Sequence, residues 1–391
     1  MLCRLSSVLP PLAGLICGLV ASLPASWSSA AAVERVLFER EGQRRQVAGR
    51  LLAEAADGGV LIKAPDGIIW PIPGEEIRER IVEEAPFEPL PRAELARRLL
   101  QQLPPGFEVF ETSRYLILYD TSRGYAQWCG SLFERLYMGF TNYWSRRGFE
   151  LSEPEFPLVA IIFADRRAFQ IHARGELGDA AESVVGYYNL QTNHMTMFDL
   201  TGVESLAAAR GGRRGSSAVV NDILSRPEAE QLVATIVHEA THQLAFNCGL
   251  HARLSDCPLW FSEGIAMFFE TPDLGTMRGW RTIGAVNHPR LARLRDYAQR
   301  RPHDSLLTLI RDDRRFRDPA TSLDAYGEAW GLTHFLIRRR PQQYLEYLRL
   351  LSEKKPLYQD GPERRLEEFV AVFGDLDRLE QEFRRHIASI R

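Results

Sequence analysis

Two histidines lie four residues apart near the middle of the chain, with an acidic residue directly after the first. They are His238 and His242, and the acidic residue is Glu239. Residues four apart share one face of a helix, so both imidazoles can reach a single cation. Glu239 would then point about 100° away, near a water molecule on that cation but outside its ligand shell. This spacing is typical of a metal site in which a carboxylate activates water.

The surrounding sequence predicts the helix that this geometry requires. Apolar residues recur with helical period over 232–244. Ser225 and Glu228 fit a capping box, and Pro227 has a backbone angle suited to a first helical turn. Gly249 is a natural stop after the last apolar residue. We therefore expect one helix between this cap and Gly249.

A second helix is expected over 258–270, with Glu263 in its first turn. The offset of 263 − 242 = 21 residues leaves room for one loop and a returning helix. A carboxylate there would complete a site of two histidines and one glutamate, with one position open for water. Zinc at such a site lowers the pKa of its water to about 7, and Glu239 would take the proton as the water attacks a carbonyl.

Both segments resemble the gluzincin clan of metallopeptidases, in which His-Glu-x-x-His is followed by Trp-x-x-Glu-Gly-x-Ala. More closely, His-Glu-Ala-Thr-His-Gln-Leu-Ala-Phe-Asn with Trp-Phe-Ser-Glu-Gly resembles an exported bacterial family of unknown function within that clan. The similarity is strong over 232–270 and weaker over 325–336 and 369–375. It implies zinc as the metal, a peptide or protein as the substrate, Glu239 as the base, and three metal ligands, which are His238, His242 and Glu263.

Tyr326 is a further candidate for catalysis. Gluzincin aminopeptidases place a transition-state tyrosine at a similar distance from the third ligand, and here the offset is 326 − 263 = 63 residues. A phenol at the site would donate a hydrogen bond to the developing oxyanion. The alternative is an aromatic residue that packs at a helix start. His334 is a second candidate for the same role, although its apolar neighbours favour a core histidine.

The chain also departs from the clan. Some gluzincins carry an acidic residue four positions after the third ligand to orient a histidine, and here that residue is Met267. Glu270 or Asp256 would have to hold the histidine instead. The chain has no Gly-x-Met-Glu-Asn motif, which exopeptidases of the clan use to hold a free amino group. An edge strand at Val184–Tyr188 or His194–Phe198 would pair with an extended substrate.

The first 32 residues have the order of a secretory signal. Arg4 precedes an apolar stretch over 8–23, and mostly small residues follow up to a cleavage site near Ala30–Ala32. A transmembrane anchor is the alternative, but the stretch is marginal for crossing a bilayer. We therefore expect a secreted or periplasmic protein with no stable membrane insertion after cleavage. In an oxidising compartment Cys248 and Cys257 would form a disulfide across the loop between the two expected helices. The alternative, which the sequence leaves open, is two ordinary thiols of the loop or the core.

The pattern of elements predicts an α+β protein, with a gluzincin-like domain of a mixed sheet and helices behind a small β-rich module. Short strand-like runs and turn signals over 33–84 indicate a barrel-like module, and a linker with a short helix follows over 85–106. Residues 107–391 would form the zinc peptidase domain. In that domain we expect paired strands at 107–111 and 115–119, a helix at 123–144, a buried strand at 157–163, a hairpin at 184–198, a loop at 207–217, and mainly helices from 225 onward.

Composition narrows the function. Charged residues make up 25% of the 391 residues and the net charge is −3. Arginines alternate with acids, as at 364–368, and form no long basic stripe, which argues against a nucleic-acid partner. The sequence thus predicts an exported zinc peptidase. The alternatives are a zinc-bound scaffold or binding protein without proteolysis, and a hydrolase of another amide such as a cell-wall bond.

Overall fold

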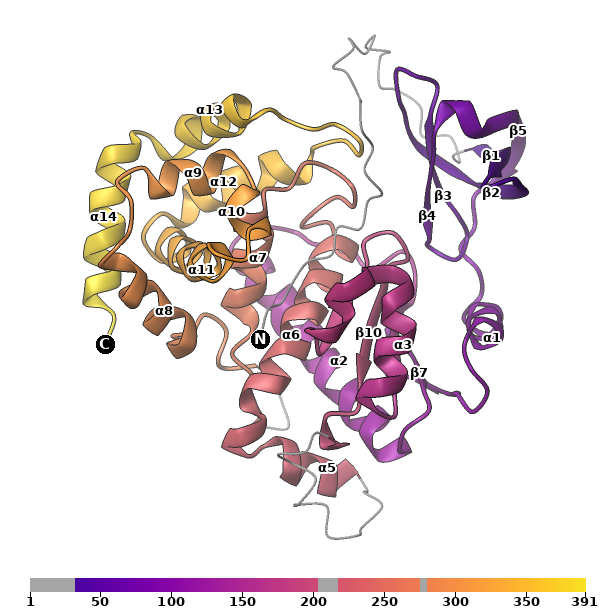
Figure 1. Ribbon diagram of the computed structural model, residues 1–391, viewed down its shortest axis with the longest axis horizontal. Coiled ribbons are helices and arrows are strands. Elements are labelled where there is room, and N and C mark those ends of the chain that lie inside the picture. Colours follow the sequence, from indigo (N-terminus) through magenta and orange to yellow (C-terminus); the bar gives the residue numbers. More distant parts are fainter. Residues whose placement is uncertain (1–31, 203–216, 275–279) are drawn as a thin grey trace.

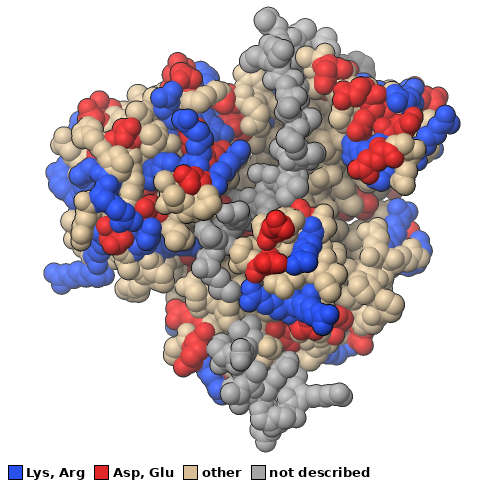
Figure 2. Space-filling view, in the orientation of Figure 1, with Lys and Arg blue, Asp and Glu red and all other residues tan. Residues whose placement is uncertain are grey.

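A computed structural model describes residues 32–202, 217–274 and 280–391. The described residues form two five-stranded sheets and a large helical part, which confirms the predicted α+β class. Figure 1 shows the first sheet at one side of the molecule, the second near the centre, and the C-terminal helices at the other side. The expected signal over 1–32 and most of the loop at 207–217 lie outside the described residues. Basic and acidic side chains are interleaved over much of the face in Figure 2.

The first sheet forms the N-terminal module. Its strands are β1 (Ala32–Arg40), β2 (Gln43–Glu54), β3 (Val60–Lys63), β4 (Ile69–Ile72) and β5 (Ile77–Pro86), in the order β4-β3-β2-β1-β5. All described pairings in it are antiparallel. In the described part of the chain the pairings leave β4 and β5 as the outer strands, so the predicted β-rich module is a five-stranded antiparallel sheet that no ladder between β4 and β5 closes. Its small core includes Val36, Phe38 and Ile62.

The second sheet is mixed and belongs to the larger domain. It contains β6 (Glu108–Glu111), β7 (Tyr115–Tyr119), β8 (Leu158–Phe163), β10 (His194–Phe198) and β9 (Gly186–Tyr188), in that order across the sheet. β7, β8 and β10 are parallel neighbours, and β6 and β9 are antiparallel edges. The three central strands are fully buried, and β7 and β8 are apolar throughout, as expected for parallel strands covered on both faces. The expected hairpin is therefore confirmed, with β9 as its edge strand.

Helices form the rest of the described chain, as expected from residue 225 onward. Those before His238 and its helix are α1 (Arg92–Gln102), α2 (Arg123–Ser145), α3 (Arg166–Leu177) and α5 (Ser217–Leu224). That helix and those after it are α6 (Pro227–Asn247), α7 (Leu259–Phe269), α8 (His288–Ala298), α9 (Ser305–Arg311), α10 (Arg314–Arg317), α11 (Ser322–Arg339), α12 (Pro341–Ser352), α13 (Pro362–Phe373) and α14 (Leu376–Ser389). No helix among the described residues is long and apolar enough to span a membrane.

α7 and α11 pack with almost no space between their backbones at Gly264. A Cβ atom on Gly264 would lie 2.0 Å from the hydroxyl oxygen of Thr333 and 3.1 Å from the carbonyl oxygen of Ala329. Any side chain there would push the two helices apart. A glycine directly after Glu263 therefore allows α11 to lie against the helix that carries this residue.

The loop between α6 and α7 is held by buried charges and not by a disulfide. Among the described residues, Cys248 and Cys257 are free thiols, so of the two alternatives the bridge is not formed. Cys248 is fully buried, whereas Cys257 is half-buried at the edge of the same core.

Arg365 supplies the link that the disulfide was expected to make. Its Nε donates to Asp256 Oδ2 in the loop at 3.0 Å, and its Nη1 donates to Asp313 Oδ1 at 3.0 Å. Asp313 also accepts a hydrogen bond from the backbone N–H of Leu259, the first residue of α7. This charged cluster therefore fixes both the loop and the start of α7.

The module contacts the larger domain at the turn of the β9–β10 hairpin. Arg253 donates to the carbonyl oxygens of Gly67 in the module and Leu190 in the turn. The backbone N–H of Ile69 donates to the carbonyl oxygen of Gln191 at 2.9 Å. The two sheets are therefore joined through the turn that follows β9.

Candidate metal centre

Both predicted histidines lie on α6, at the face that meets α7. The helix begins at Pro227, with Arg226 as its N-cap and no side-chain capping bond. The expected capping box of Ser225 was therefore wrong, while the proline at the first turn was correct. The helix ends at Asn247, two residues before Gly249, whose φ of +82° only glycine adopts freely.

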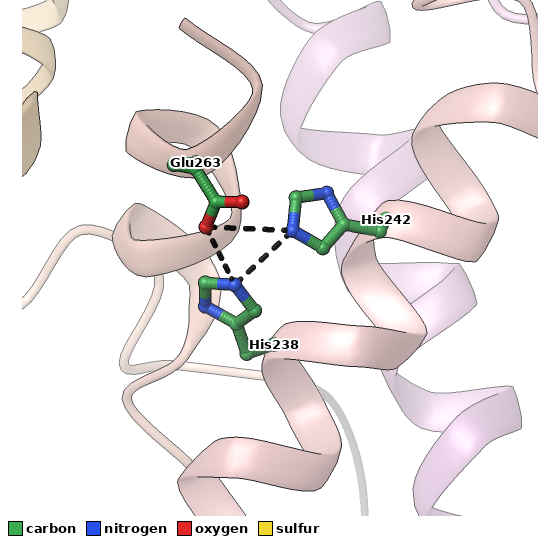
Figure 3. A group of neighbouring side chains, drawn as sticks. All are labelled: His238, His242 and Glu263. Atoms are coloured by element: carbon green, nitrogen blue, oxygen red, sulfur yellow. Dashed lines mark hydrogen bonds and ion pairs between the residues drawn. The ribbon is translucent and has the colours of Figure 1, made fainter. Parts of the chain in front are cut away.

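His238, His242 and Glu263 meet between α6 and α7 (Figure 3). His238 Nε2 lies 3.1 Å from His242 Nε2 and 3.0 Å from Glu263 Oε2. His242 Nε2 lies 3.7 Å from the same carboxylate oxygen. All three side chains are at most 1% exposed. The structure thus brings together the three residues that the sequence predicted as ligands.

The chemistry of the three atoms fits a cation between them. Glu270 Oε2 lies 2.8 Å from His238 Nδ1, so this nitrogen carries the proton and, in the neutral ring, Nε2 presents its lone pair to Glu263. Glu263 Oε1 is also buried and has no hydrogen-bond partner among the residues that the structure describes. Burial raises the pKa of Glu263, but the two histidines outweigh it and lower this pKa to about 2. Lone pairs and an ionised carboxylate that converge in a buried space form a metal-ligand set.

Glu270, at the end of α7, orients His238 from behind. Its other oxygen, Oε1, accepts hydrogen bonds from Asn287 Nδ2 at 2.6 Å and Arg290 Nε at 3.1 Å. Burial raises the pKa of Glu270, but Arg290 and His238 outweigh it and lower this pKa to about 2. An ionised carboxylate on the second nitrogen fixes the ring and makes it a stronger ligand. Of the two expected candidates, Glu270 occupies this position, while Asp256 pairs with Arg365.

We expect Glu270→Gln to weaken zinc binding by about 10–100-fold, because the amide gives His238 a weaker acceptor than the carboxylate. Competition with a chromogenic chelator measures this affinity. Glu346→Gln on exposed surface of α12 is the matched control, and it should bind zinc as the unaltered chain does. Equal zinc affinity in the two variants would show that Glu270 does not support the metal site.

Glu239 lies on a different face of α6, against the second sheet. Its Oε2 accepts a hydrogen bond from the backbone N–H of Tyr188 at 3.0 Å, and the side chain is 3% exposed. Tyr188 is the last residue of β9, so the edge strand and the metal ligands lie on adjacent sides of this helix. The structure therefore places Glu239 beside the ligands but outside the cluster of converging atoms, as its position in the sequence predicted.

Two further polar residues position α6, and the sequence analysis missed both. Gln243 Nε2 donates to the carbonyl oxygens of Val159 and Asn193, and Asn247 Nδ2 donates to Asn193 Oδ1. Glu239, Gln243 and Asn247 follow one another at intervals of four residues, which places them on one helix face. This spacing in the sequence could have predicted that α6 turns a polar face toward the sheet.

Residues 232–358 match the family model described as "Protein of unknown function (DUF1570)". The comparison with curated proteins found no match. The DUF1570 match contains the three converging ligands, Glu239 and Tyr326, and it ends before α13. It agrees with the resemblance to a family of unknown function, and it leaves the chemistry of the site to be inferred from its geometry.

Tyr326 and His334, the other candidates in the DUF1570 segment, both lie on α11. The Tyr326 ring packs edge-on against Phe316, and the guanidinium of Arg290 lies 5.6 Å from its centre. Arg290 also donates a hydrogen bond to Glu270, which contacts His238. The described contacts therefore connect Tyr326 to the predicted ligands only indirectly, through Arg290 and Glu270. His334 forms a buried pair with His386 of α14, as expected for a core histidine.

Proposed function

We propose that this protein is an exported zinc metallopeptidase of the gluzincin type. The observation that carries the proposal is the convergence of His238, His242 and Glu263, with Glu239 beside them and held by the edge strand. A purely structural metal site needs no base next to its ligands. Two histidines and one glutamate leave a coordination position open, as catalytic zinc sites require.

Each of these side chains would have a separate task. A zinc ion held by the three ligands supplies Lewis acidity, which polarises a carbonyl group and makes water more acidic. Glu239 would accept the proton of the attacking water and pass it to the leaving amine. The backbone N–H of Tyr188 keeps one oxygen of this carboxylate in place. Glu270 holds the ring of His238 in the tautomer that binds metal.

The edge strand β9 would bind the substrate. In an antiparallel ladder, backbone groups point alternately to the neighbour and away from it. Tyr187 lies opposite Thr196, and Asn189 N–H bonds to His194, so the outward groups are those of Gly186 and Tyr188. The Tyr188 N–H already donates to Glu239, so a substrate strand would use the backbone groups of Gly186 and the carbonyl oxygen of Tyr188. An extended peptide would add to this edge as a further strand. This favours a peptide over a compact amide as the substrate.

We expect the purified protein to contain about one zinc per chain, and to release it as the pH falls below about 6, because histidine ligands must be neutral. Elemental analysis after dialysis at several pH values measures both. Digestion of a peptide library, with and without chelator, tests the activity. A chain that contains no transition metal and takes up none from zinc solution would rule out the proposal. Bound zinc without cleavage of any peptide would instead support a binding protein.

We expect Tyr326→Phe to lower kcat by about 10²–10³-fold and to leave KM and zinc content nearly unchanged, because an oxyanion donor acts mainly in the transition state. Steady-state kinetics on a cleaved peptide measures the two constants. The phenyl ring preserves the packing on Phe316 and Arg290, so a purely structural tyrosine would tolerate this change. A kcat near that of the unaltered chain would therefore assign Tyr326 to packing.

A further inference from the structure

A cavity of about 680 Å³ lies between the C-terminal ends of α2, α7 and α11, the start of α12, and α14. Three arginines line it, which are Arg147, Arg338 and Arg339, and its described lining contains no carboxylate. In the part of the chain that the structure describes, none of the three forms an ion pair with an acid. A second cavity of about 490 Å³ adjoins it and shares Arg339 and His386.

Two arginines and two histidines form a chain of contacts along this cavity. Arg338 Nε lies 3.1 Å from His334 Nε2, His334 Nδ1 lies 2.9 Å from His386 Nε2, and His386 Nδ1 lies 3.4 Å from Arg339 Nε. Burial, with the charge of nearby arginines, lowers the pKa of both histidines to about 4. At pH 7 each imidazole is therefore neutral and carries one N–H.

In this series of four side chains, the N–H hydrogens outnumber the contacts that can hold them. Each of the three contacts holds one hydrogen, but the two Nε–H groups of arginine and one N–H from each histidine supply four in total. One N–H group is thus left without an acceptor. The longest contact joins His386 and Arg339, so the surplus hydrogen lies between them. Both residues line both cavities, and His386 is 7% exposed.

The other arginines are held so that they face the same space. Arg338 Nη2 donates to the carbonyl oxygen of Gly284 at 2.7 Å. Arg147 Nη1 donates to the carbonyl oxygen of Tyr143, and its guanidinium lies 3.5 Å from the centre of that ring. Guanidinium groups fixed in this way lose little freedom when they bind an oxyanion. Tyr143, Phe268 and Ile283 supply an apolar wall to the same cavity.

We propose that this cavity binds a phosphate monoester, with the phosphate on the three arginines and an apolar or aromatic substituent on Tyr143, Phe268 and Ile283. A phosphate group carries a charge of about −1.5 to −2 near pH 7 and several strong acceptor oxygens. It therefore matches three guanidinium groups that form no ion pair with an acid among the described residues, and it accepts the surplus N–H, better than a single carboxylate does. The site is separate from the metal ligands and does not depend on the proposed peptidase activity.

Isothermal titration of the full chain with phenyl phosphate and with inorganic phosphate, at constant ionic strength, tests the proposal. We expect saturable binding of both, tighter for phenyl phosphate, and at least about tenfold weaker binding in Arg147→Gln and in Arg339→Gln. Arg384→Gln is the matched control. It also removes one positive charge, but Arg384 lies on α14 and lines neither cavity, so this change should alter the affinity by less than about twofold.

Three outcomes would overturn the proposal. The first is no saturable binding of either probe. The second is an equal loss of phosphate affinity in Arg384→Gln, which would show that the binding reflects only the overall positive charge of the surface. The third is phenyl phosphate that binds no more tightly than inorganic phosphate, which would show that the apolar wall does not bind the substituent of a phosphate ester. Circular dichroism and zinc content of each variant confirm that the fold and the metal centre are intact.

Arg339→Lys keeps the positive charge but removes the planar guanidinium group, so we expect its phosphate affinity to lie between those of Arg339→Gln and the unaltered chain.

Discussion

Glu239→Gln is expected to lower kcat by at least about 10³-fold while the chain keeps its zinc. The amide has nearly the shape of the carboxylate and can still accept the hydrogen bond from the Tyr188 N–H. It cannot take a proton at neutral pH, and a positioned base contributes about 10²–10⁴-fold on its own. The ligands His238, His242 and Glu263 are unchanged, so metal affinity should stay close to that of the unaltered chain.

The measurement is a comparison of kcat and zinc content in parallel. Glu230→Gln makes the same chemical change on the same helix, at an exposed position in its first turn, and should leave both unchanged. If Glu239→Gln loses zinc as well as activity, the carboxylate is part of the metal-binding shell. If it stays fully active, water is activated by another group and the assignment of the base is wrong.

Arg365→Ala is expected to destabilise the protein by about 3–5 kcal/mol. The change leaves Asp256, which is 1% exposed, and Asp313 without their main cation, and an uncompensated buried charge has a cost of this size. Lys354 lies 3.8 Å from Asp256 and compensates only in part. Because the same cluster holds the start of α7, zinc affinity should fall together with stability.

Denaturant unfolding followed by tryptophan fluorescence measures the loss. Arg364→Ala is the matched control at the next position. The Arg364 side chain is 61% exposed and pairs with Glu367 and Glu368 along its own helix, so its removal should cost less than about 1 kcal/mol. A similar loss in both variants would show that the buried cluster has no special part in stability.

The local elements of the site were predictable from sequence because they depend on short-range periodicity. The helix with His238 and His242, the helix with Glu263, and the hairpin of β9 and β10 all appear within two or three residues of their expected bounds. The capping box at Ser225 failed because Pro227 already suits the first turn and the chain uses no side-chain cap there.

The remaining features depend on contacts between distant residues. His334 and His386 are 52 residues apart, and their pairing follows from the packing of α14 against α11. The partner of Glu239 is a backbone N–H, which any residue at position 188 would supply, so no side-chain motif reports it. Closeness in sequence likewise left open whether Cys248 and Cys257 are bridged, because this depends on how the loop between α6 and α7 folds.

The close approach of α7 and α11 at Gly264 links metal occupancy to heat stability. Glu263 and Gly264 are adjacent, so α11 rests on the backbone that presents a metal ligand. A ligand that binds only the folded state raises its stability by mass action, by about 4 kcal/mol at a thousandfold excess over Kd. Zinc bound at one end of this contact would therefore raise the melting temperature of C-terminal helices that do not touch it, and a chelator would lower it.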